Sequence, residues 1–320
     1  MSSVGRFHKF IQARDAAGLK FHMSRHMTKE PNITIEYRNT QAFLGACRDG
    51  SNEICEVLIS FGANVSPNNG CYTAPLSLAC SNAHPACVDL LLSHGADANV
   101  GDWAFMYYLS PLMEAVRYKT HVDLTLDEFI DNRCRCIRSL LTAGVTIDQT
   151  DHAGRTSLML AAWNIRLTVI LVEAGANMNI LDNINTSVLH IACMRDTSVD
   201  VAEYFLERGA DINAVTTSGI TPLHYACTQF MCATVETLLC RGADIDIANN
   251  NGRTPLDLTL SNPSISANRV AVLQLIATCA QTRLEASSAD WIRLARNERS
   301  RPQVAIGSMG TARVRRRRHI

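Results

Sequence analysis

The sequence predicts an all-α fold, built as a solenoid of repeated helical pairs. Two ladders of small residues lead to this prediction, because each recurs at roughly constant spacing along most of the 320 residues. Such a period indicates that one supersecondary unit is stacked many times. The alanines of the first ladder are Ala13, Ala46, Ala79, Ala115, Ala161, Ala192 and Ala226, and the glycines of the second are Gly62, Gly95, Gly144, Gly175, Gly209 and Gly242.

The unit at residues 218–249 shows how each repeat is built. Thr221 is a suitable N-cap for a helix that begins at the following proline, where a missing amide donor costs nothing. Val235 and Leu238 share one face of a second helix, because apolar residues three apart lie on the same side. Gly242 can end that helix in a left-handed conformation, and the polar segment after it reverses the chain. Two short antiparallel helices per repeat are therefore expected.

These residues resemble the ankyrin repeat family. The family signature of Thr-Pro-Leu-His with a nearby alanine, followed by Gly-Ala-Asp or Gly-Ala-Asn, occurs as TPLHYA and RGADID, and related lines cover roughly residues 40–276. The resemblance implies helix-turn-helix-β-hairpin units stacked in a curved array, whose concave face consists of hairpin fingers and first helices. It also implies that His190 and His224, at the signature histidine position, are structural hydrogen-bonding residues.

The repeats divide the sequence into three parts. Residues 1–38 are predicted to form a degenerate N-terminal capping repeat, in which Ala13 keeps the register. Residues 39–280 are predicted to form an ankyrin repeat domain of about seven repeats, with an insertion near 119–131. Residues 281–320 are predicted as a basic and largely disordered C-terminal tail, because the ladders stop and apolar residues become sparse.

One hairpin finger is longer than the others and aromatic. In five hairpins the ladder glycine and the signature proline position are 13 residues apart, whereas Gly95 and Pro111 are 16 apart. An aromatic cluster on a protruding loop is typical of a protein-binding hot spot. Folding of these rings back onto a neighbouring finger is the alternative, and both interpretations stay open. The aromatic residues of this finger are Trp103, Phe105, Tyr107 and Tyr108.

The same repeat has an insertion between its two helices. Ala115 and Gly144 are 29 residues apart where 16 is usual, which places the extra residues near 119–131. Thr125 and Glu128 have the spacing of a capping box, so we expect the insertion to lengthen the second helix by one or two turns. A solvated face on which neighbouring charges pair is favoured over a site for a basic partner. These charges are Asp123, Asp127, Glu128 and Asp131 against Arg133, Arg135 and Arg138.

The next repeat is shortened instead. Ala161 and Gly175 are only 14 residues apart, so the turn around Trp163 is clipped. We expect Trp163 to pack over this turn as a core residue rather than to stand exposed for binding.

The motifs that the sequence lacks argue against several classes of function. None of the phosphate-binding, nucleophile-elbow or zinc-protease motifs occurs in the sequence, so an enzyme is not expected, and neither is a cofactor. The 12 cysteines lack zinc spacing and are expected to be free thiols, and no metal site is expected. The sequence shows neither a secretory signal nor an apolar run long enough for a membrane span. We therefore expect a cytoplasmic monomer. Neither a small-molecule substrate nor a nucleic-acid partner is expected.

The tail is strongly basic, whereas the rest of the chain is acidic. Residues 281–320 hold ten arginines and three acidic residues, a net charge of about +7 that balances about −7 in the rest of the chain. The run of Arg315, Arg316, Arg317 and Arg318 is consistent with a nuclear import signal, a patch for an anionic surface or a nucleic acid, or a solvated charged end. The first of these interpretations would make the protein nuclear as well as cytoplasmic.

The sequence therefore predicts a scaffold or adaptor that binds an unidentified partner protein through the concave face and the fingers. The alternative is the substrate-recognition subunit of a cullin-type ubiquitin ligase, because many ankyrin proteins carry a SOCS box after the last repeat. Leu275 and Cys279 have the leucine-to-cysteine spacing of that box. Arg283 then stands where an apolar residue is expected, so the match is degenerate.

Overall fold

The computed structural model describes most of the chain as helices and connecting loops. The described residues are 9–26, 41–66, 74–100, 109–118, 125–194, 199–261 and 267–299. The chain forms two compact units, Met1–Leu275 and Ile276–Ile320.

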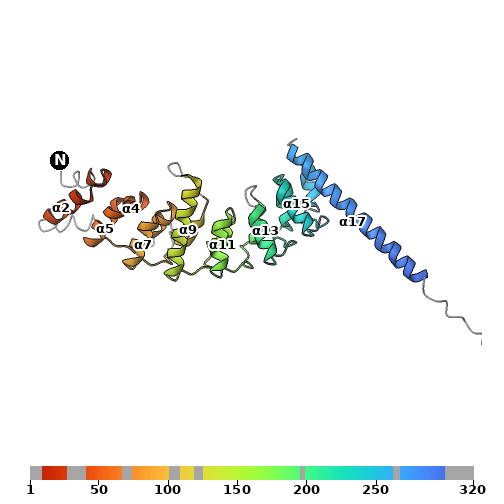
Figure 1. Ribbon diagram of the computed structural model, residues 1–320, viewed down its shortest axis with the longest axis horizontal. Helices are drawn as coiled ribbons and strands as arrows, with labels where there is room; N and C mark the ends of the chain where they lie inside the picture. Colours follow the sequence, from red (N-terminus) through yellow and green to blue (C-terminus); the bar gives the residue numbers. More distant parts are fainter. Residues whose placement is uncertain are drawn as a thin grey trace, which may run out of the picture. The chain divides into compact units, whose positions relative to one another are not determined.

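The first unit is a row of helical pairs joined by loops (Figure 1). First helices contact the first helices of adjacent pairs, and second helices contact second helices, so the pairs stack as two layers. This arrangement confirms the predicted all-α repeat fold. The first helices are α4 (Gln41–Arg48), α6 (Pro75–Ser81), α8 (Pro111–Val116), α10 (Ser157–Ala161), α12 (Val188–Ala192), α14 (Pro222–Thr228) and α16 (Pro255–Ser261). The second helices are α5 (Asn52–Ser60), α7 (Pro85–Ser93), α9 (Leu126–Thr142), α11 (Ile165–Glu173), α13 (Val199–Glu207) and α15 (Cys232–Cys240).

The two ends of this row have helices of their own. At the N-terminal end, α2 (Ala16–His26) packs against α5. At the other end, α17 (Ala267–Arg299) begins beside α16, where the guanidinium group of Arg269 donates to the carbonyl oxygens of Thr259 and Leu260 at 3.1 and 2.9 Å.

The small-residue ladders mark the tightest points of the stack. Ala79, Ala115 and Ala226 are fully buried, because neighbouring repeats leave room for only a methyl group there. Gly144 and Gly209 have φ values of 79° and 83°, a left-handed conformation in which other residues are strained. The residue after each glycine donates its backbone amide to the last turn of the second helix, so the glycine ends that helix.

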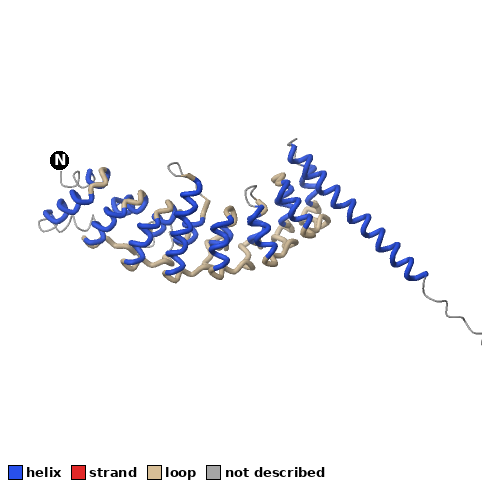
Figure 2. The backbone as a smooth tube through the Cα atoms, viewed as in Figure 1, coloured by secondary structure: helices blue, strands red, loops and turns tan. Residues whose placement is uncertain are grey.

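The hairpins are tight turns rather than strand pairs. Figure 2 shows helices and loops in the described part of the chain, and the one complete β-bridge recorded there joins Thr150 to Thr156. The tips are instead closed by a few backbone hydrogen bonds. The amide of Thr216 donates to the carbonyl of Ile220 at 3.0 Å, and the amide of Asn249 donates to that of Arg253 at 2.9 Å.

Asp and Asn side chains connect successive hairpins. The Oδ1 atom of Asn99 accepts from the Thr146 amide at 2.7 Å, and Oδ1 of Asp148 accepts from the Asn177 amide at 3.0 Å. The same bridge recurs later, where Oδ1 of Asn213 accepts from the amide of the next hairpin at 2.9 Å. These polar residues therefore hold neighbouring repeats in register.

The cysteines in the described part of the chain are free thiols, as expected, and most are buried. Cys80, Cys193 and Cys227 directly follow ladder alanines and have no exposed surface. Burial raises the pKa of the Cys227 thiol to about 12 and raises those of Cys80 and Cys193, because a thiolate is poorly solvated in the core. These cysteines act as small apolar core residues.

The C-terminal helix differs from the sequence prediction. A largely disordered tail was expected from residue 281, but α17 continues without interruption to Arg299. Residues 300–320 lie outside the described residues, as does the arginine run. In the parts of the chain that are described, we find no helix with the length and apolar character of a membrane span.

Candidate partner-binding groove

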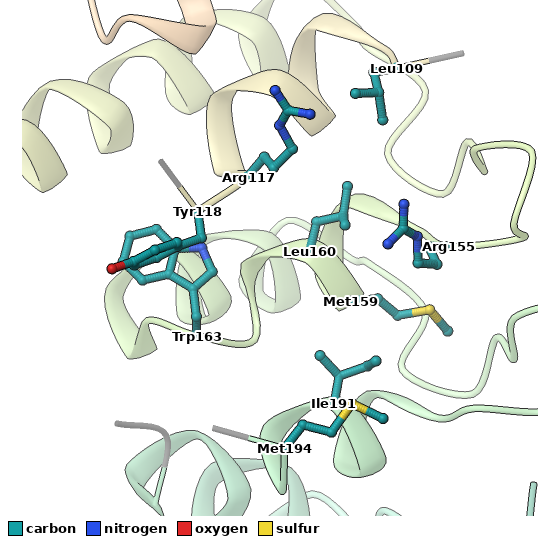
Figure 3. A pocket seen from close by; sticks show the side chains of 9 residues that line it. All are labelled: Leu109, Arg117, Tyr118, Arg155, Met159, Leu160, Trp163, Ile191 and Met194. Atoms are coloured by element: carbon teal, nitrogen blue, oxygen red, sulfur yellow. The ribbon is translucent and has the colours of Figure 1, made fainter. Parts of the chain in front are cut away.

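A cavity of about 570 Å³ opens on the side of the first helices, across three successive repeats (Figure 3). We call it the groove. Its residues come from the end of the long finger, the end of α8, the helix α10 with the turns on either side of it, and the end of α12. The lining residues are Leu109, Arg117, Tyr118, Arg155, Met159, Leu160, Trp163, Ile191 and Met194.

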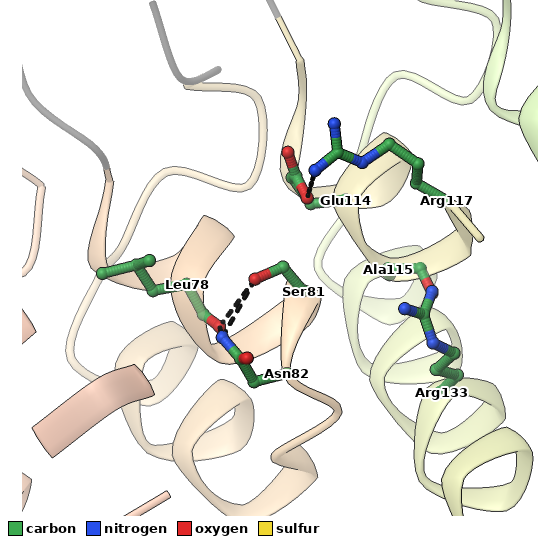
Figure 4. Close-up of polar contacts among 7 residues, drawn as sticks. All are labelled: Leu78, Ser81, Asn82, Glu114, Ala115, Arg117 and Arg133. Atoms are coloured by element: carbon green, nitrogen blue, oxygen red, sulfur yellow. Dashed lines mark hydrogen bonds and ion pairs between the residues drawn. The ribbon is translucent and has the colours of Figure 1, made fainter. Parts of the chain in front are cut away.

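The groove begins where α8 ends abruptly. In an ordinary first helix such as α6, the last turn is closed locally, and the Asn82 side-chain amide donates to the Leu78 carbonyl at 2.8 Å (Figure 4). After α8 the chain instead turns away, because Arg117 is extended with φ −60° and ψ 133°. The last carbonyls of such a helix have no partners within it and need donors from elsewhere.

Two side chains from other helices and turns supply those donors. The Nη1 atom of Arg133, on α9, donates to the Ala115 carbonyl at 2.6 Å (Figure 4). The indole nitrogen of Trp163 donates to the Val116 carbonyl at 2.8 Å. The lengthened helix α9 and the clipped turn at Trp163 therefore both contact the end of α8.

Arg133 corrects one expectation from the sequence. It was expected on a solvated face of paired charges, but it is fully buried. Its Nε and Nη2 atoms make no hydrogen bond to any described residue, and its guanidinium lies 4.5 Å from the centre of the Phe129 ring. Burial lowers the pKa of Arg133 to about 10, although the nearby Glu114 charge acts in the opposite direction. Asp131, expected to pair locally, forms an ion pair with Arg166 of the next repeat.

The expected extension of the second helix is confirmed. Thr125 and Glu128 form a capping box, in which Thr125 Oγ1 accepts from the Glu128 amide at 3.3 Å and Glu128 Oε2 accepts from the Thr125 amide at 3.2 Å. Helix α9 has 17 residues, whereas α7 and α11 have 9 each. Residues 119–124 of the insertion lie outside the described residues.

Trp163 forms one wall of the groove. It is 9% exposed, which confirms the expectation that it packs over the clipped turn. Tyr118 meets its ring edge-on, with centroids 5.1 Å apart and an interplanar angle of 84°. Because Tyr118 is 51% exposed, this aromatic pair has a buried half and an accessible half. Such a pair offers rigid apolar area to a partner.

Two arginines stand on the rim, each beside an acidic residue. Arg155 donates through Nε to Asp151 Oδ2 at 2.8 Å, and its Nη2 lies 2.7 Å from the same oxygen. Asp151 is itself buried and also accepts from the Arg155 backbone amide at 2.8 Å. Nη2 of Arg117 lies 3.6 Å from Glu114 Oε2. The Arg155 and Arg117 side chains are 38% and 48% exposed, so both remain accessible to a partner.

The site residues predicted from the sequence lie outside the described residues. This holds for Trp103, Phe105, Tyr107 and Tyr108, and for Arg315, Arg316, Arg317 and Arg318. Leu109, the first described residue after the aromatic finger, lines the groove. The role of the finger in binding stays a prediction.

Sequence reasoning missed the other residues of the groove. Leu160 and Ile191 each precede a ladder alanine, and both are half-buried where their neighbours are core. The equivalent position in the next repeat is Tyr225, which is also half-buried. A signal was therefore present, because the residue before the ladder alanine is partly exposed in these three repeats, although the equivalent Glu114 is buried. The cavity itself depends on how the repeats pack.

The signature histidines are structural, as the resemblance implied. Nδ1 of His224 accepts from the Thr221 amide at 3.1 Å, and its Nε2 lies 3.1 Å from the Arg253 carbonyl of the next repeat. His190 makes the same pair of contacts, with the Ser187 amide at 3.1 Å and the Ile220 carbonyl at 3.0 Å. Within the described residues no cluster of His, Cys, Asp and Glu is arranged to hold a metal ion.

The comparisons with known proteins place this fold in a family. The family profile described as ankyrin repeats (three copies) matches residues 19–102, 43–126, 126–216, 158–249 and 189–282. The chain therefore belongs to the ankyrin repeat family, whose members are protein-interaction modules.

Individual relatives are similar mainly through these repeats. A putative ankyrin repeat protein of fowlpox virus, FPV031, is 33% identical over 146 residues, which are 43% of this chain and 39% of the relative. The ankyrin repeat and KH domain-containing protein mask-1 of Caenorhabditis elegans is 29% identical over 237 residues, 66% of this chain and 8% of the relative. The matches thus span well under two thirds of these two proteins.

One solved structure is similar in fold. The human ASB11 ankyrin repeat domain superposes with a TM-score of 0.57 at 24% identity, covering 73% of this chain and 96% of that domain. At this identity the likeness supports the fold alone.

Proposed function

We propose that this protein is a scaffold that binds a partner protein in the groove, with the aromatic finger at residues 101–108 as part of the contact surface. The main supporting observation is that three departures from the repeat meet there. The long finger ends at Leu109, the insertion displaces the chain after α8, and the clipped turn brings Trp163 onto Val116. A repeat that only has to stack gains nothing from such departures.

The wall of the groove suits a protein contact. Leu160, Ile191 and Met194 are half-buried, so their side chains offer apolar area without being part of the closed core. Tyr118 and Trp163 add an aromatic pair, and such residues are enriched in binding hot spots. Because helices hold these side chains, little conformational entropy is lost when a partner binds.

Two pairs of substitutions test this proposal. One pair alters the groove, Leu160→Ser with Met194→Ser, and the other alters the finger, Trp103→Ala with Tyr107→Ala. The partner is captured with tagged protein and identified by mass spectrometry. Each pair of substitutions should abolish capture of the same partner. A control of the same chemistry is Leu260→Ser, because Leu260 is 52% exposed on α16, outside the groove.

The thermal unfolding transition separates binding from stability. If the finger aromatics are exposed for binding, Trp103→Ala with Tyr107→Ala should leave the transition nearly unchanged. A large drop in the midpoint would show that these rings are core, which would remove the finger from the proposal. Capture that survives the groove substitutions would contradict the proposal for the groove itself.

A further inference from the structure

The described lining of the groove contains basic but no acidic side chains, although each arginine is paired with an acid that lies just outside the lining. Among its described lining residues are two arginines and no aspartate or glutamate. In the view of Figure 3, Leu160 lies between the guanidinium groups of Arg117 and Arg155, with Met159, Ile191 and Met194 beyond it. The groove therefore combines an apolar floor with two accessible guanidinium groups on its rim.

The rim arginines keep donors for a ligand. Arg155 uses Nε and Nη2 on Asp151, and its Nη1 atom makes no hydrogen bond to the described residues. The Arg117 guanidinium is 3.6 Å from Glu114, which is too long for a hydrogen bond, so this contact is an ion pair only. Both groups are thus held in place by an acid while N–H donors remain for an incoming acceptor. A ligand carboxylate can accept from these remaining N–H groups in charge-assisted hydrogen bonds, which add to the ion pairs already present.

The floor is apolar and adaptable. Met194 is half-buried and brings a flexible thioether side chain, which fits partners of different shapes, above the buried Met159. Leu160 and Ile191 present aliphatic area between them and the rim. An aliphatic or aromatic side chain of a partner would lose contact with water here, which favours binding in proportion to the apolar area buried.

We infer that the groove takes a linear segment of the partner in which an apolar residue is flanked by carboxylates. This inference rests on the proposed function of the groove and adds the chemistry of its occupant. The apolar residue fills the floor against Leu160 and Met194, while flanking aspartates or glutamates accept from Arg117 and Arg155. The carboxylates contribute to specificity and to the rate of encounter, as charges at the rim of an interface do.

A phage-displayed library of random decapeptides tests the inference on the full chain. Peptides selected on the unaltered protein should contain an apolar residue flanked by an excess of Asp and Glu. Arg117→Gln should weaken their binding about fivefold, the effect of losing one accessible ion pair. The affinity should also fall as salt is raised from 0.05 to about 0.5 M, because rim charges are screened.

A matched control exists on α15. Arg241 is 43% exposed and lies 3.5 Å from Glu207, a geometry close to that of Arg117 with Glu114. Arg241→Gln should leave peptide binding unchanged. An equal loss from Arg241→Gln would show a general charge effect and would overturn the inference.

The outcomes separate this inference from the function on which it rests. Selected peptides that are neutral or basic, but lose binding with Leu160→Ser, would overturn the acidic preference and keep the groove as a binding site. A library that yields no peptide sensitive to Leu160→Ser would contradict both. If Leu160→Ser unfolds the repeat, Tyr118→Ser serves as the second groove variant, because Tyr118 is 51% exposed.

Discussion

At the scale of single residues, His190 and His224 show how a signature side chain holds the stack. Each ring accepts from the N-cap amide of its own helix and meets a carbonyl of the next repeat. Because Nδ1 accepts from an amide, the proton is on Nε2, which donates to the carbonyl. The neutral ring thus satisfies one group in each of two repeats.

This arrangement makes stability depend on pH. Burial is the largest influence on both histidines and lowers their pKa below the ordinary value of 6.5. The unfolded chain therefore binds protons more readily than the folded one. The stabilisation is fully present above about pH 6.5 and is lost as the pH falls through the lower pKa of the folded state.

Urea unfolding at pH 7.5 and pH 5.5 measures this effect. The free energy of unfolding should be smaller at pH 5.5, and the difference should shrink in the double variant His190→Gln with His224→Gln. A difference of the same size in the double variant would show that other groups cause it.

Residue scale is also where sequence reasoning fails for Arg133 and succeeds for Trp163. The sequence showed arginines near acids on a helix, which is typical of a solvated face. It did not show that the Arg133 side chain would reach a carbonyl 18 positions away on another helix. Trp163 was predicted as core because the clipped turn is visible in the spacing, although its bond to Val116, 47 positions away, was not.

At the scale of elements, the early end of α8 and the greater length of α9 are connected. The short α8 leaves two carbonyls that Arg133 and Trp163 satisfy, and the long α9 carries the arginine that does so. The length of α9 was predictable, because a capping box is a local pattern that a sequence shows directly. The end of α8 was not, because no local sequence pattern indicates the extended C-cap at Arg117.

The capping box gives an element-scale prediction. Thr125→Ala removes the side-chain cap of α9 and should lower the free energy of unfolding by about 1 kcal/mol. The control is Thr142→Ala at the other end of the same helix, where the hydroxyl only donates back to the Arg138 carbonyl. Urea unfolding of the two variants compares them directly, and equal losses would mean that the cap contributes nothing specific.

At the scale of the whole row of repeats, one junction between successive hairpins lacks a side-chain hydrogen bond that other junctions have. Asn99, Asp148 and Asn213 each accept from the backbone amide of the following hairpin. Among the described residues no such bond joins Asn179 to the Asp211 amide. The groove spans this junction, since Leu160 and Ile191 come from the repeats on either side of it.

Hydrogen exchange can detect this difference. The Asp211 amide should exchange at least about tenfold faster than those of Asn177 and Asp244, because an unbonded hairpin amide needs no opening of the stack. Equal protection at the three amides would show that the junction is as closed as its neighbours. The amide of Thr217 still donates to the Ile184 carbonyl across this junction at 2.9 Å, so only the side-chain bond is missing. The repeat period predicted that hairpins would follow one another, but not which of them would share that side-chain bond.

The central claim is that the groove binds the partner, and site-specific photo-crosslinking tests it most directly. A photo-reactive amino acid is placed at Tyr118 in the groove, or at Leu260 on α16 as an equally exposed control. The proposal predicts a covalent adduct with the captured partner from position 118 and none from position 260. An adduct from position 260 alone would contradict it.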